Sequence, residues 1–471
     1  RTLRAALEWS YGLLTPQEQT IFARLSVFSG GFDLDIAEQV CTDDELQSWD
    51  VLDHVSALVD KSLLSSDLGE PPRYRLLDTP RSFAQEQLKA GADARNIFQR
   101  HADCMYERLL QAQKGEWERD GSAIIDRLVT DLDNLRAALT WAAGDDGDAD
   151  RLINLAGTGS IVWRSAKAEG EGLAWSEKAM DVICKTTDAN AEAELLVSFA
   201  IMSHQRDADR EISSLIRATE LFRRLENRQK LYFALGALAK KQIWRRDLEA
   251  AEAAIDEAEV LFNSAWPPAV REPVLQARTY LLEILGRPEE GEPLMLELVD
   301  IMRAVNDPHR IDMALLELAE SYIVQGKLDA AVSVHREVCM RTQKRGAPYI
   351  SANLGNLAAA LTQLGELDEA VKVARLAIPL LHRQRKLIVF LDHFALLACR
   401  LGNARVGALV CGRADAEMAT TGFQREVSET IARELVQKEL DAAFDAATVL
   451  KLQTEGVSMT NEHAAKLAIE E

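Results

Sequence analysis

The chain of 471 residues is 47% hydrophobic and 27% charged, which indicates a folded protein and excludes a disordered one. Its formal net charge of -21 would repel the phosphates of nucleic acids and of anionic lipids, so we expect neither as a direct partner of this segment. Six scattered cysteines without a C-x-x-C pair are typical of reduced thiols in a cytoplasmic protein. The chain opens at Arg1, and we interpret it as a piece of a longer polypeptide.

The first 95 residues predict a winged-helix domain. A capping box at Thr15-Pro16-Gln17-Glu18 marks one helix start. Two extended runs, 62–66 and 73–77, flank a Gly/Pro turn and predict a β-hairpin, which would be the wing. Helices are expected at 2–14, from Pro16 to the Gly30-Gly31 pair, at 34–41, at 51–59 and from about Thr79.

Charge argues against DNA as the ligand of this winged helix. Residues 1–95 hold nine Lys/Arg and sixteen Asp/Glu, a net of -7 (9 minus 16). The helix in the recognition position carries Asp50, Asp53 and Asp60 and no basic residue. A helix that reads duplex DNA normally brings cations to the phosphates, so we predict that this domain docks on protein.

From residue 97 on, the pattern is helical almost to the end, and it repeats. Seven positions recur at steps of 37 to 40 residues: Ala179, Ala218, Ala258, Leu298, Val338, Ala377 and Ala414. The segments that begin at Gly326 and Gly365 are nearly identical, and each has a Gly that ends one helix before a Leu and a small residue begin the next. Such self-similarity predicts stacked helix pairs that resemble tetratricopeptide repeats, with Arg246 standing where other repeats have the Gly.

No motif for catalysis is present. There is no phosphate-binding G-x-x-x-x-G-K-[ST] loop, no G-x-S-x-G elbow and no H-E-x-x-H pair in the sequence. His101 with Cys104 and His335 with Cys339 have helical spacing, but two ligands do not make a zinc site, and we interpret both pairs as structural. The sequence therefore predicts a binding protein that is not an enzyme.

The repeats predict a concave surface lined by first helices of the pairs. Arg164, His204, Trp244 and Gln363 fall at similar positions near helix ends. A groove with aromatic residues and both charge signs suits a peptide or a small metabolite, although solvated or packing roles for these residues stay open. The predicted groove residues are Lys240, Trp244, Tyr280, Glu283, Glu320, Asn356, Gln363, His393 and Arg400.

Several stretches resemble a known family. They are Leu3-Arg4-Ala5-Ala6-Leu7-Glu8-Trp9-Ser10-Tyr11, Leu25-Ser26-Val27-Phe28-Ser29-Gly30-Gly31-Phe32, Leu58-Val59-Asp60-Lys61-Ser62-Leu63 and Asp133-Asn134-Leu135-Arg136-Ala137-Ala138-Leu139. In this order they look like the region after the ATPase domain in bacterial STAND-type regulators, the signal-transduction ATPases with numerous domains, and resemble the LuxR/OmpR-type ATP-binding regulators among them. Pro80 departs from the family, which usually has an aliphatic residue there.

The resemblance implies a sensor module whose winged helix contacts an upstream NB-ARC-like ATPase domain of the same polypeptide. ATP or ADP would bind in that absent domain, and no cofactor is expected in this segment. The predicted fold is mainly α, with a winged-helix domain at 1–95, a helical connector at 96–166, a tetratricopeptide-like α-solenoid at 167–423 and capping helices at 424–471. The predicted function is signal reception by the superhelix, from a small molecule or a protein, with a constitutive tetratricopeptide scaffold as the alternative.

Overall fold

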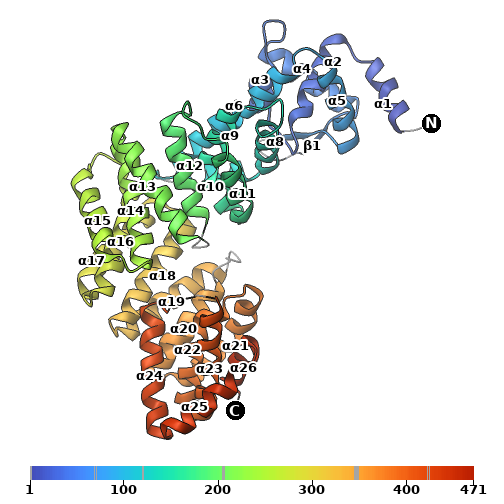
Figure 1. Ribbon diagram of the computed structural model, residues 1–471. Helices are drawn as coiled ribbons and strands as arrows, with labels where there is room; N and C mark the ends of the chain where they lie inside the picture. Colours follow the sequence, from blue (N-terminus) through green and yellow to red (C-terminus); the bar gives the residue numbers. More distant parts are fainter. Residues whose placement is uncertain are drawn as a thin grey trace. The chain divides into compact units, whose positions relative to one another are not determined.

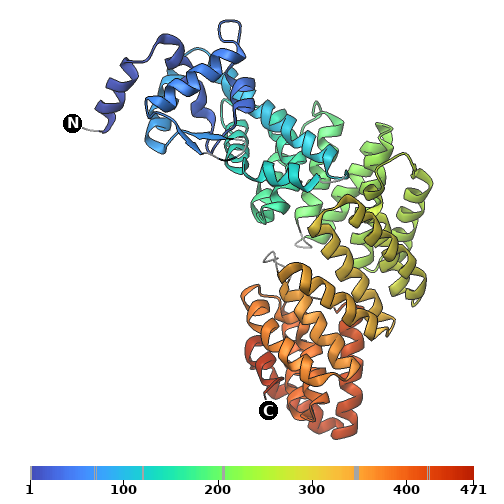
Figure 2. The same ribbon diagram turned by 180° about the vertical axis from the view of Figure 1, so that it is seen from behind.

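Helices build nearly all of the chain in the computed structural model, which describes residues 3–67, 69, 72–118, 121–203, 207–343, 350–421, 423 and 425–470 (Figures 1 and 2). The chain divides into two compact units, Arg1–Val274 and Leu275–Glu471. The division lies inside one helix of the predicted repeat region, and the four domains expected from the sequence stay a prediction. Over the described residues, no helix combines the length and the apolar character needed to cross a membrane.

The first unit begins with the expected winged helix. The capping box is confirmed, because Thr15 N donates to Glu18 Oε2 at 2.8 Å and Glu18 N donates to Thr15 Oγ1 at 3.2 Å. The hairpin is confirmed as well, with Ser66 paired to Tyr74 between antiparallel strands. The elements are α1 (Leu3–Gly12), α2 (Pro16–Arg24), η1 (Leu25–Val27), α3 (Leu34–Cys41), α4 (Ser48–Asp60), β1 (Ser65–Asp67), β2 (Arg73–Arg75) and α5 (Asp78–Ala90).

A helical connector follows the winged helix. Its longest element is α6, whose 22 residues span about 33 Å at 1.5 Å per residue. His101 of α6 is 1% exposed and packs edge-on against Phe28 of the winged helix at 5.2 Å, so it is a core residue as predicted. The connector comprises α6 (Ala94–Gly115), α7 (Gly121–Val129), α8 (Leu132–Ala142), α9 (Ala149–Thr158) and α10 (Ser160–Ser165).

Antiparallel helix pairs make up the rest of the first unit and most of the second (Figures 1 and 2). In the first unit these are α11 (Glu169–Met180), α12 (Ala189–Met202), α13 (Ala208–Arg224), α14 (Arg228–Trp244), α15 (Leu248–Leu261) and η2 (Pro268–Arg271). The helix α16 (Glu272–Ile284) contains the division between the units. The second unit continues with α17 (Pro288–Val305), α18 (Pro308–Val324), α19 (Leu328–Gln343), α20 (Ile350–Leu364), α21 (Leu367–Arg383), α22 (Leu387–Arg400), α23 (Ala404–Thr421), α24 (Val427–Ala443), α25 (Ala446–Gly456) and α26 (Asn461–Leu467).

The repeat register read from the sequence is confirmed by burial. All seven recurring positions are 0% exposed, and each lies on the second helix of a pair: Ala179, Ala218, Ala258, Leu298, Val338, Ala377 and Ala414. The small residues seven positions upstream, such as Ala331 and Ala370, are also 0% exposed. Glu211 breaks this rule, since it is fully buried at a small-residue position and pairs with Lys241 Nζ at 2.5 Å.

The turns inside the pairs explain the glycine pattern and its exceptions. Gly326 and Gly365 adopt φ of 71° and 94°, in the left-handed region that a residue without Cβ enters at no steric cost. Arg246 adopts φ of 61° at the equivalent place. The turn geometry is therefore retained where the glycine is missing, and the arginine there occupies a left-handed conformation that is costly for a residue with a Cβ.

Candidate functional site

Lys240 and Trp244, the predicted groove residues of the first unit, lie one helical turn apart at the end of α14. Lys240 is half-buried, and Trp244 is 37% exposed. The ammonium of Lys241 lies 5.1 Å from the centre of the Trp244 ring, a cation–π contact. Trp244 is thus accessible to a ligand on part of its surface while its ring already contacts a cation. His204, which shares its register, lies outside the described residues.

Three predicted groove residues of the second unit come together in an acidic cluster. Burial raises the pKa of Glu283 to about 7, with its carboxylate hydrogen-bonded to Ser321 and the Glu320 carboxylate nearby. Burial likewise raises the pKa of Glu320 to about 7. Burial, with the neighbouring Glu317, raises the pKa of Tyr280 far above its usual value. These three groups are consequently neutral or partly protonated near neutral pH.

The helix α24 covers part of this predicted groove from within the same unit. Ser428 of α24 hydrogen-bonds Glu320, and Arg400 of α22 pairs with Glu439 of α24 at 3.3 Å. Asp392 of α22 is 0% exposed and accepts from Arg425 Nε at 2.6 Å, just before α24. Glu320 and Arg400 therefore already bind the chain's own C-terminal helix, a packing arrangement that the repeat register does not encode.

The remaining predicted groove residues differ in exposure. Asn356 and Gln363, on α20, are half-buried, and Gln363 Nε2 has no hydrogen-bond partner among the described residues. His393, on α22, is 4% exposed and lies 6.2 Å from the Phe390 ring, and burial lowers its pKa to about 4. A neutral, enclosed imidazole of this kind belongs to the core of the second unit.

A cavity in the first unit was missed by the sequence prediction. It has a volume of about 470 Å³ and lies between α6, α10, α12 and α14. Trp117 and Phe233 form one wall, with ring centres 5.4 Å apart and planes at 60°. Val197 and Ile201 of α12 add aliphatic surface. The walls combine first helices of the repeats with the end of α6, which is not a repeat helix.

Two ion pairs stand in the lining of this cavity. Arg164 Nη2 of α10 lies 3.0 Å from Glu116 Oε1, just after α6. Lys230 of α14 pairs with Glu194 of α12, and Glu194 also accepts from Gln113 Nε2 of α6 at 3.1 Å. Arg164 is the residue that a sequence signal could have found, because it shares the register of Trp244 and Gln363. Trp117 and Glu116 lie outside the repeats, so no periodicity marks them.

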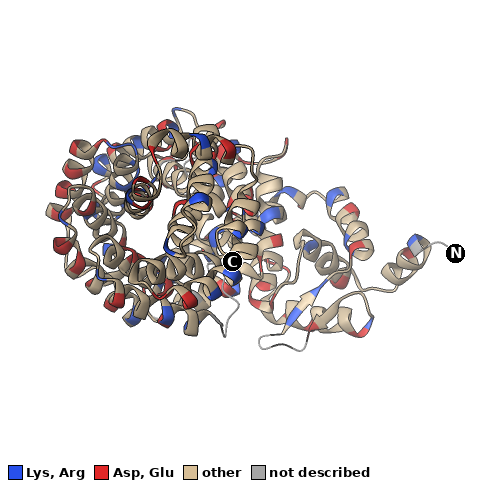
Figure 3. Cartoon of the chain, turned by 90° about the horizontal axis from the view of Figure 1, so that it is seen from below, with Lys and Arg blue, Asp and Glu red and all other residues tan. Residues whose placement is uncertain are grey.

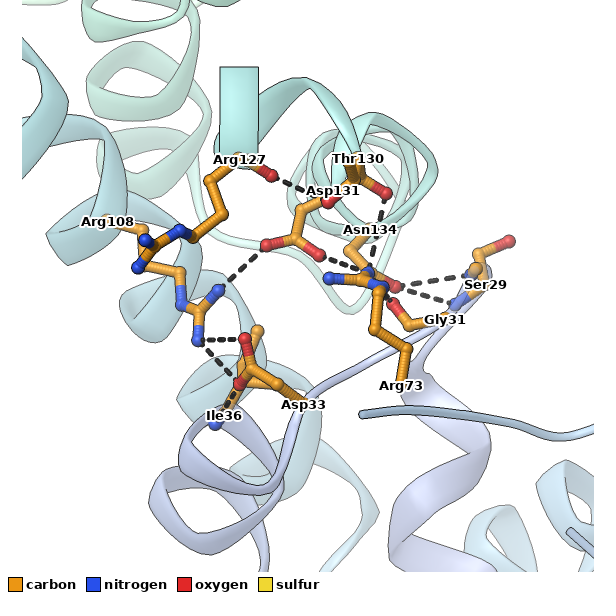
Figure 4. Close-up of polar contacts among 11 residues, drawn as sticks. Ser29, Gly31, Asp33, Ile36, Arg73, Arg108, Arg127, Thr130, Asp131 and Asn134 are labelled. Atoms are coloured by element: carbon orange, nitrogen blue, oxygen red, sulfur yellow. Dashed lines mark hydrogen bonds and ion pairs between the residues drawn. The ribbon is translucent and has the colours of Figure 1, made fainter. Parts of the chain in front are cut away.

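A polar junction joins the winged helix to the connector (Figure 4). Arg108 of α6 donates to Asp33 at 2.7 and 3.0 Å and to Asp131 Oδ2 at 2.8 Å. Arg73 of β2 donates to Asp131 Oδ1 at 2.6 Å. Asn134 of α8 accepts from Ser29 N at 3.0 Å and donates to Gly31 O at 3.0 Å. Asp131 is 1% exposed, so a buried carboxylate at the start of α8 holds two arginines, one of them from the wing.

The helix α4, in the recognition position, has an acidic and apolar exposed face. It buries Val51, Val55 and Leu58, while Trp49 is 67% and Leu52 is 43% exposed. No Lys or Arg occurs between Ser48 and Asp60. Over the chain as a whole, Lys and Arg are interspersed with Asp and Glu (Figure 3). Such a face brings no cation to duplex phosphates.

No metal centre emerges from the part of the chain that the structure describes, where no group of three or more His, Cys, Asp or Glu is arranged to hold an ion. His335 is 0% exposed, and its Nδ1 lies 2.8 Å from Asn353 Oδ1. Asn353 Nδ2 also donates to Cys339 Sγ at 3.0 Å. His335 is thus a buried residue, and Asn353 links it to Cys339.

Comparison with known proteins agrees with this architecture. Residues 14–89 match a family described as the winged helix-turn-helix domain. Proteins of Mycobacterium bovis and Mycobacterium tuberculosis named "Putative HTH-type transcriptional regulator" are 36% identical over 182 residues, which are 38% of this chain and 20% of theirs. An uncharacterized Mycobacterium tuberculosis protein is 36% identical over 104 residues, 21% of this chain and 26% of that protein. The chain thus spans about a fifth of the length of the relatives named as regulators.

A solved structure has the same fold over nearly the whole chain. The STAND protein with a tetratricopeptide repeat sensor from Pyrococcus horikoshii superposes with a TM-score of 0.59 at 14% identity, covering 97% of this chain and 64% of that one. At this identity the likeness shows the fold alone. The predicted fold class, a winged helix followed by a tetratricopeptide-like solenoid, is confirmed.

Proposed function

We propose that this chain is the sensor and regulatory module of a signal-transduction ATPase that acts in transcription regulation, of the LuxR/OmpR-type. In this proposal the repeats receive a signal, and the winged helix passes it to an ATPase domain upstream in the same polypeptide. The regulator names of the mycobacterial relatives and the fold shared with the STAND protein support it. The nucleotide, ATP or ADP, would bind in the upstream domain, since this sequence has no phosphate-binding loop.

The observation that carries the proposal is the polar junction between the winged helix and the connector. Arg108 holds Asp33, at the start of α3, and Asp131, at the start of α8, with one guanidinium. Breaking a buried pair on one side leaves a charge without its partner, which is costly. A displacement of α6 or α8 is therefore transmitted to the winged helix and does not dissipate in a loose linker.

Signalling through such a joint requires a difference in affinity. A ligand that binds two arrangements equally shifts nothing, and a tenfold preference for one arrangement is worth about 1.4 kcal/mol. The signal must therefore bind more tightly to the arrangement in which the winged helix releases the ATPase domain. The exposed Trp49 and Leu52 on α4 offer an apolar surface for that contact.

The test is genetic and uses the complete protein. Transcripts of a deletion strain are compared with those of strains that carry the wild type, Arg108→Gln, Asp33→Asn or Arg223→Gln. Asp33→Asn keeps the N-cap of α3, because Asn caps as well as Asp, while it weakens the pair with Arg108. Arg223→Gln is the matched control, because it removes an exposed pair with Glu257, 42% and 38% exposed.

If the protein is a regulator, deletion changes the levels of a defined set of transcripts. Both junction variants then change the levels of the same transcripts, while the control variant behaves as wild type. A constitutive scaffold predicts wild-type transcripts for both junction variants, provided that tryptophan fluorescence shows them folded. An unchanged transcript profile in the deletion strain would refute the regulatory function outright.

A further inference from the structure

We propose that the cavity between α6, α10, α12 and α14 binds a small organic monoanion with an aromatic or branched apolar body. This inference rests on the proposed sensor function, because it names the site and the class of the signal. The cavity is distinct from the predicted groove residues, none of which lines it.

The size of the cavity sets the scale of the ligand. Its volume of about 470 Å³ falls within the roughly 300–1,000 Å³ of small-molecule sites. Its floor is fixed by close helix packing, since a Cβ on Gly157 of α9 would come within 2.9 Å of Leu195 N on α12. A small metabolite fits a space of this size.

The walls determine the body of the ligand. Trp117 and Phe233 present a tilted aromatic pair, and Val197 and Ile201 add branched aliphatic groups on α12. Aromatic rings prefer offset or edge-on contacts with other rings at centroid distances of about 4.5–7 Å. A planar aromatic or a branched apolar body is therefore the complementary shape.

The two ion pairs determine the charge of the ligand. Arg164 is 41% exposed and its partner Glu116 16%, while Lys230 is 32% exposed and its partner Glu194 11%. In both pairs the cation is the accessible partner, and Glu194 is held additionally by Gln113. The groups offered to a ligand are thus a guanidinium and an ammonium, which bind a carboxylate or sulfonate by charge-assisted hydrogen bonds.

The ligand carries a single negative charge and not several. The charged residues of the lining sum to zero, three positive against three negative: Lys114, Arg164 and Lys230 against Glu116, Glu118 and Glu194. A polyphosphate would meet the exposed Glu118 and the two paired carboxylates without enough cations to neutralise it. An aromatic or branched carboxylate meets the two accessible cations without this repulsion.

The position of the cavity gives its ligand access to the junction. Gln113 and Lys114, which line the cavity, lie on the same helix as Arg108. Five residues along an α-helix correspond to about 7.5 Å, so α6 meets the ligand less than two turns from the residue that holds the winged helix.

The test titrates two probes that differ by one sulfonate group, 8-anilinonaphthalene-1-sulfonate and the neutral N-phenyl-1-naphthylamine, and follows the fluorescence of the probe. The wild type should bind the sulfonate at one saturable site and bind the neutral probe about tenfold more weakly, since a charge-assisted contact to a partly exposed cation is worth about this factor. Arg164→Gln and Lys230→Gln should each weaken the sulfonate about fivefold to tenfold and change the neutral probe less than about twofold. Ile201→Trp, which fills the cavity, should weaken both probes about tenfold or more.

Arg223→Gln, outside the cavity, is the control and should leave both titrations unchanged. Equal affinity of the wild type for both probes, or full sulfonate affinity in both charge variants, would overturn the proposed charge. Undiminished binding of both probes in a folded Ile201→Trp protein would overturn the proposed site.

Hydrogen exchange at the winged helix, measured with and without the sulfonate, distinguishes the proposed cavity from the proposed sensor function. If the sulfonate binds as predicted but hydrogen exchange at the winged helix does not change, the cavity is a binding site and signal transmission to the winged helix is contradicted. If the variants do not change the affinity of the probe, the cavity is not the binding site, and the junction experiment alone decides the regulatory function.

Discussion

The junction makes a quantitative prediction for Asp131→Ala. The substitution removes a carboxylate that is 1% exposed and that accepts from Arg73 at 2.6 Å and from Arg108 at 2.8 Å. Each hydrogen bond to a charged group is worth about 1.5–3 kcal/mol. Arg108 keeps Asp33, and both arginines are about a fifth exposed, so water replaces part of the loss. We expect the first unit to lose about 2–4 kcal/mol of unfolding free energy.

The chain provides a selective assay, because all eight tryptophans precede residue 275 and therefore lie in the first unit. In a urea titration, tryptophan fluorescence follows that unit alone, while helical circular dichroism follows both. With a denaturant dependence of about 2–3 kcal/mol per molar, the fluorescence midpoint should fall by about 1 M. The control Glu257→Ala removes an exposed partner of Arg223 and should cost about 0–1 kcal/mol. A loss for Asp131→Ala no larger than that of the control would refute the claim that the junction holds the winged helix firmly.

Four further predictions concern other parts of the chain. The acidic α4 should give no mobility shift with duplex DNA at low salt, and tight binding that weakens steeply with salt would contradict this, since that slope measures phosphate contacts. Ala370→Leu overpacks a fully buried helix contact and should destabilise the second unit by about 1–3 kcal/mol, which circular dichroism detects and tryptophan fluorescence does not. Arg246→Gly places a residue without Cβ at a left-handed position and should increase the unfolding free energy of the first unit by about 0.5–1 kcal/mol, seen as a higher urea midpoint of tryptophan fluorescence. A lower midpoint would show that the Arg246 side chain stabilises the turn. Burial and the neighbouring Glu320 raise the pKa of Glu429 to about 8, above its unfolded value, so stability that is present at acid pH is lost as pH rises through 8. Glu429→Gln should flatten this decline in stability and stabilise the second unit at pH 8 by about 1–2 kcal/mol. An unchanged pH profile of the melting temperature would show that other groups cause the decline.

The sequence predicted those parts of the fold that depend on local spacing. The small residues at Ala331 and Ala370 recur because two helices approach closely at that place in each pair, and the structure buries both. The capping box at Thr15 and the hairpin are encoded within a few residues of their own position. Short-range rules of this kind carry over from sequence to structure because their partners are neighbours in the chain.

The proposed binding cavity was less predictable, because it depends on contacts between segments that are not homologous repeats. Trp117 meets Phe233 across more than a hundred residues, and no period relates the end of α6 to α14. The predicted groove was read from repeat register alone, which carries no information on what covers a position. Glu320 and Arg400 have the inward register, yet both contact α24, whose docking site lies outside the repeat pattern.

The proposed cavity and the junction together make α6 the element on which regulation would act. Arg108 has two carboxylate partners, Asp33 in the winged helix and Asp131 in the connector that precedes the repeats. Losing or regaining one charge-assisted hydrogen bond changes the free energy by about 1.5–3 kcal/mol, which is as large as a tenfold preference of a ligand for one arrangement. A ligand that draws Gln113 and Lys114 toward the cavity therefore needs to exchange only one partner of Arg108 to shift the winged helix. In this proposal the charge of the ligand matters, because an anion that recruits Arg164 weakens its pair with Glu116, just after α6. An anion that recruits Lys230 weakens its pair with Glu194 of α12, which Gln113 of α6 contacts.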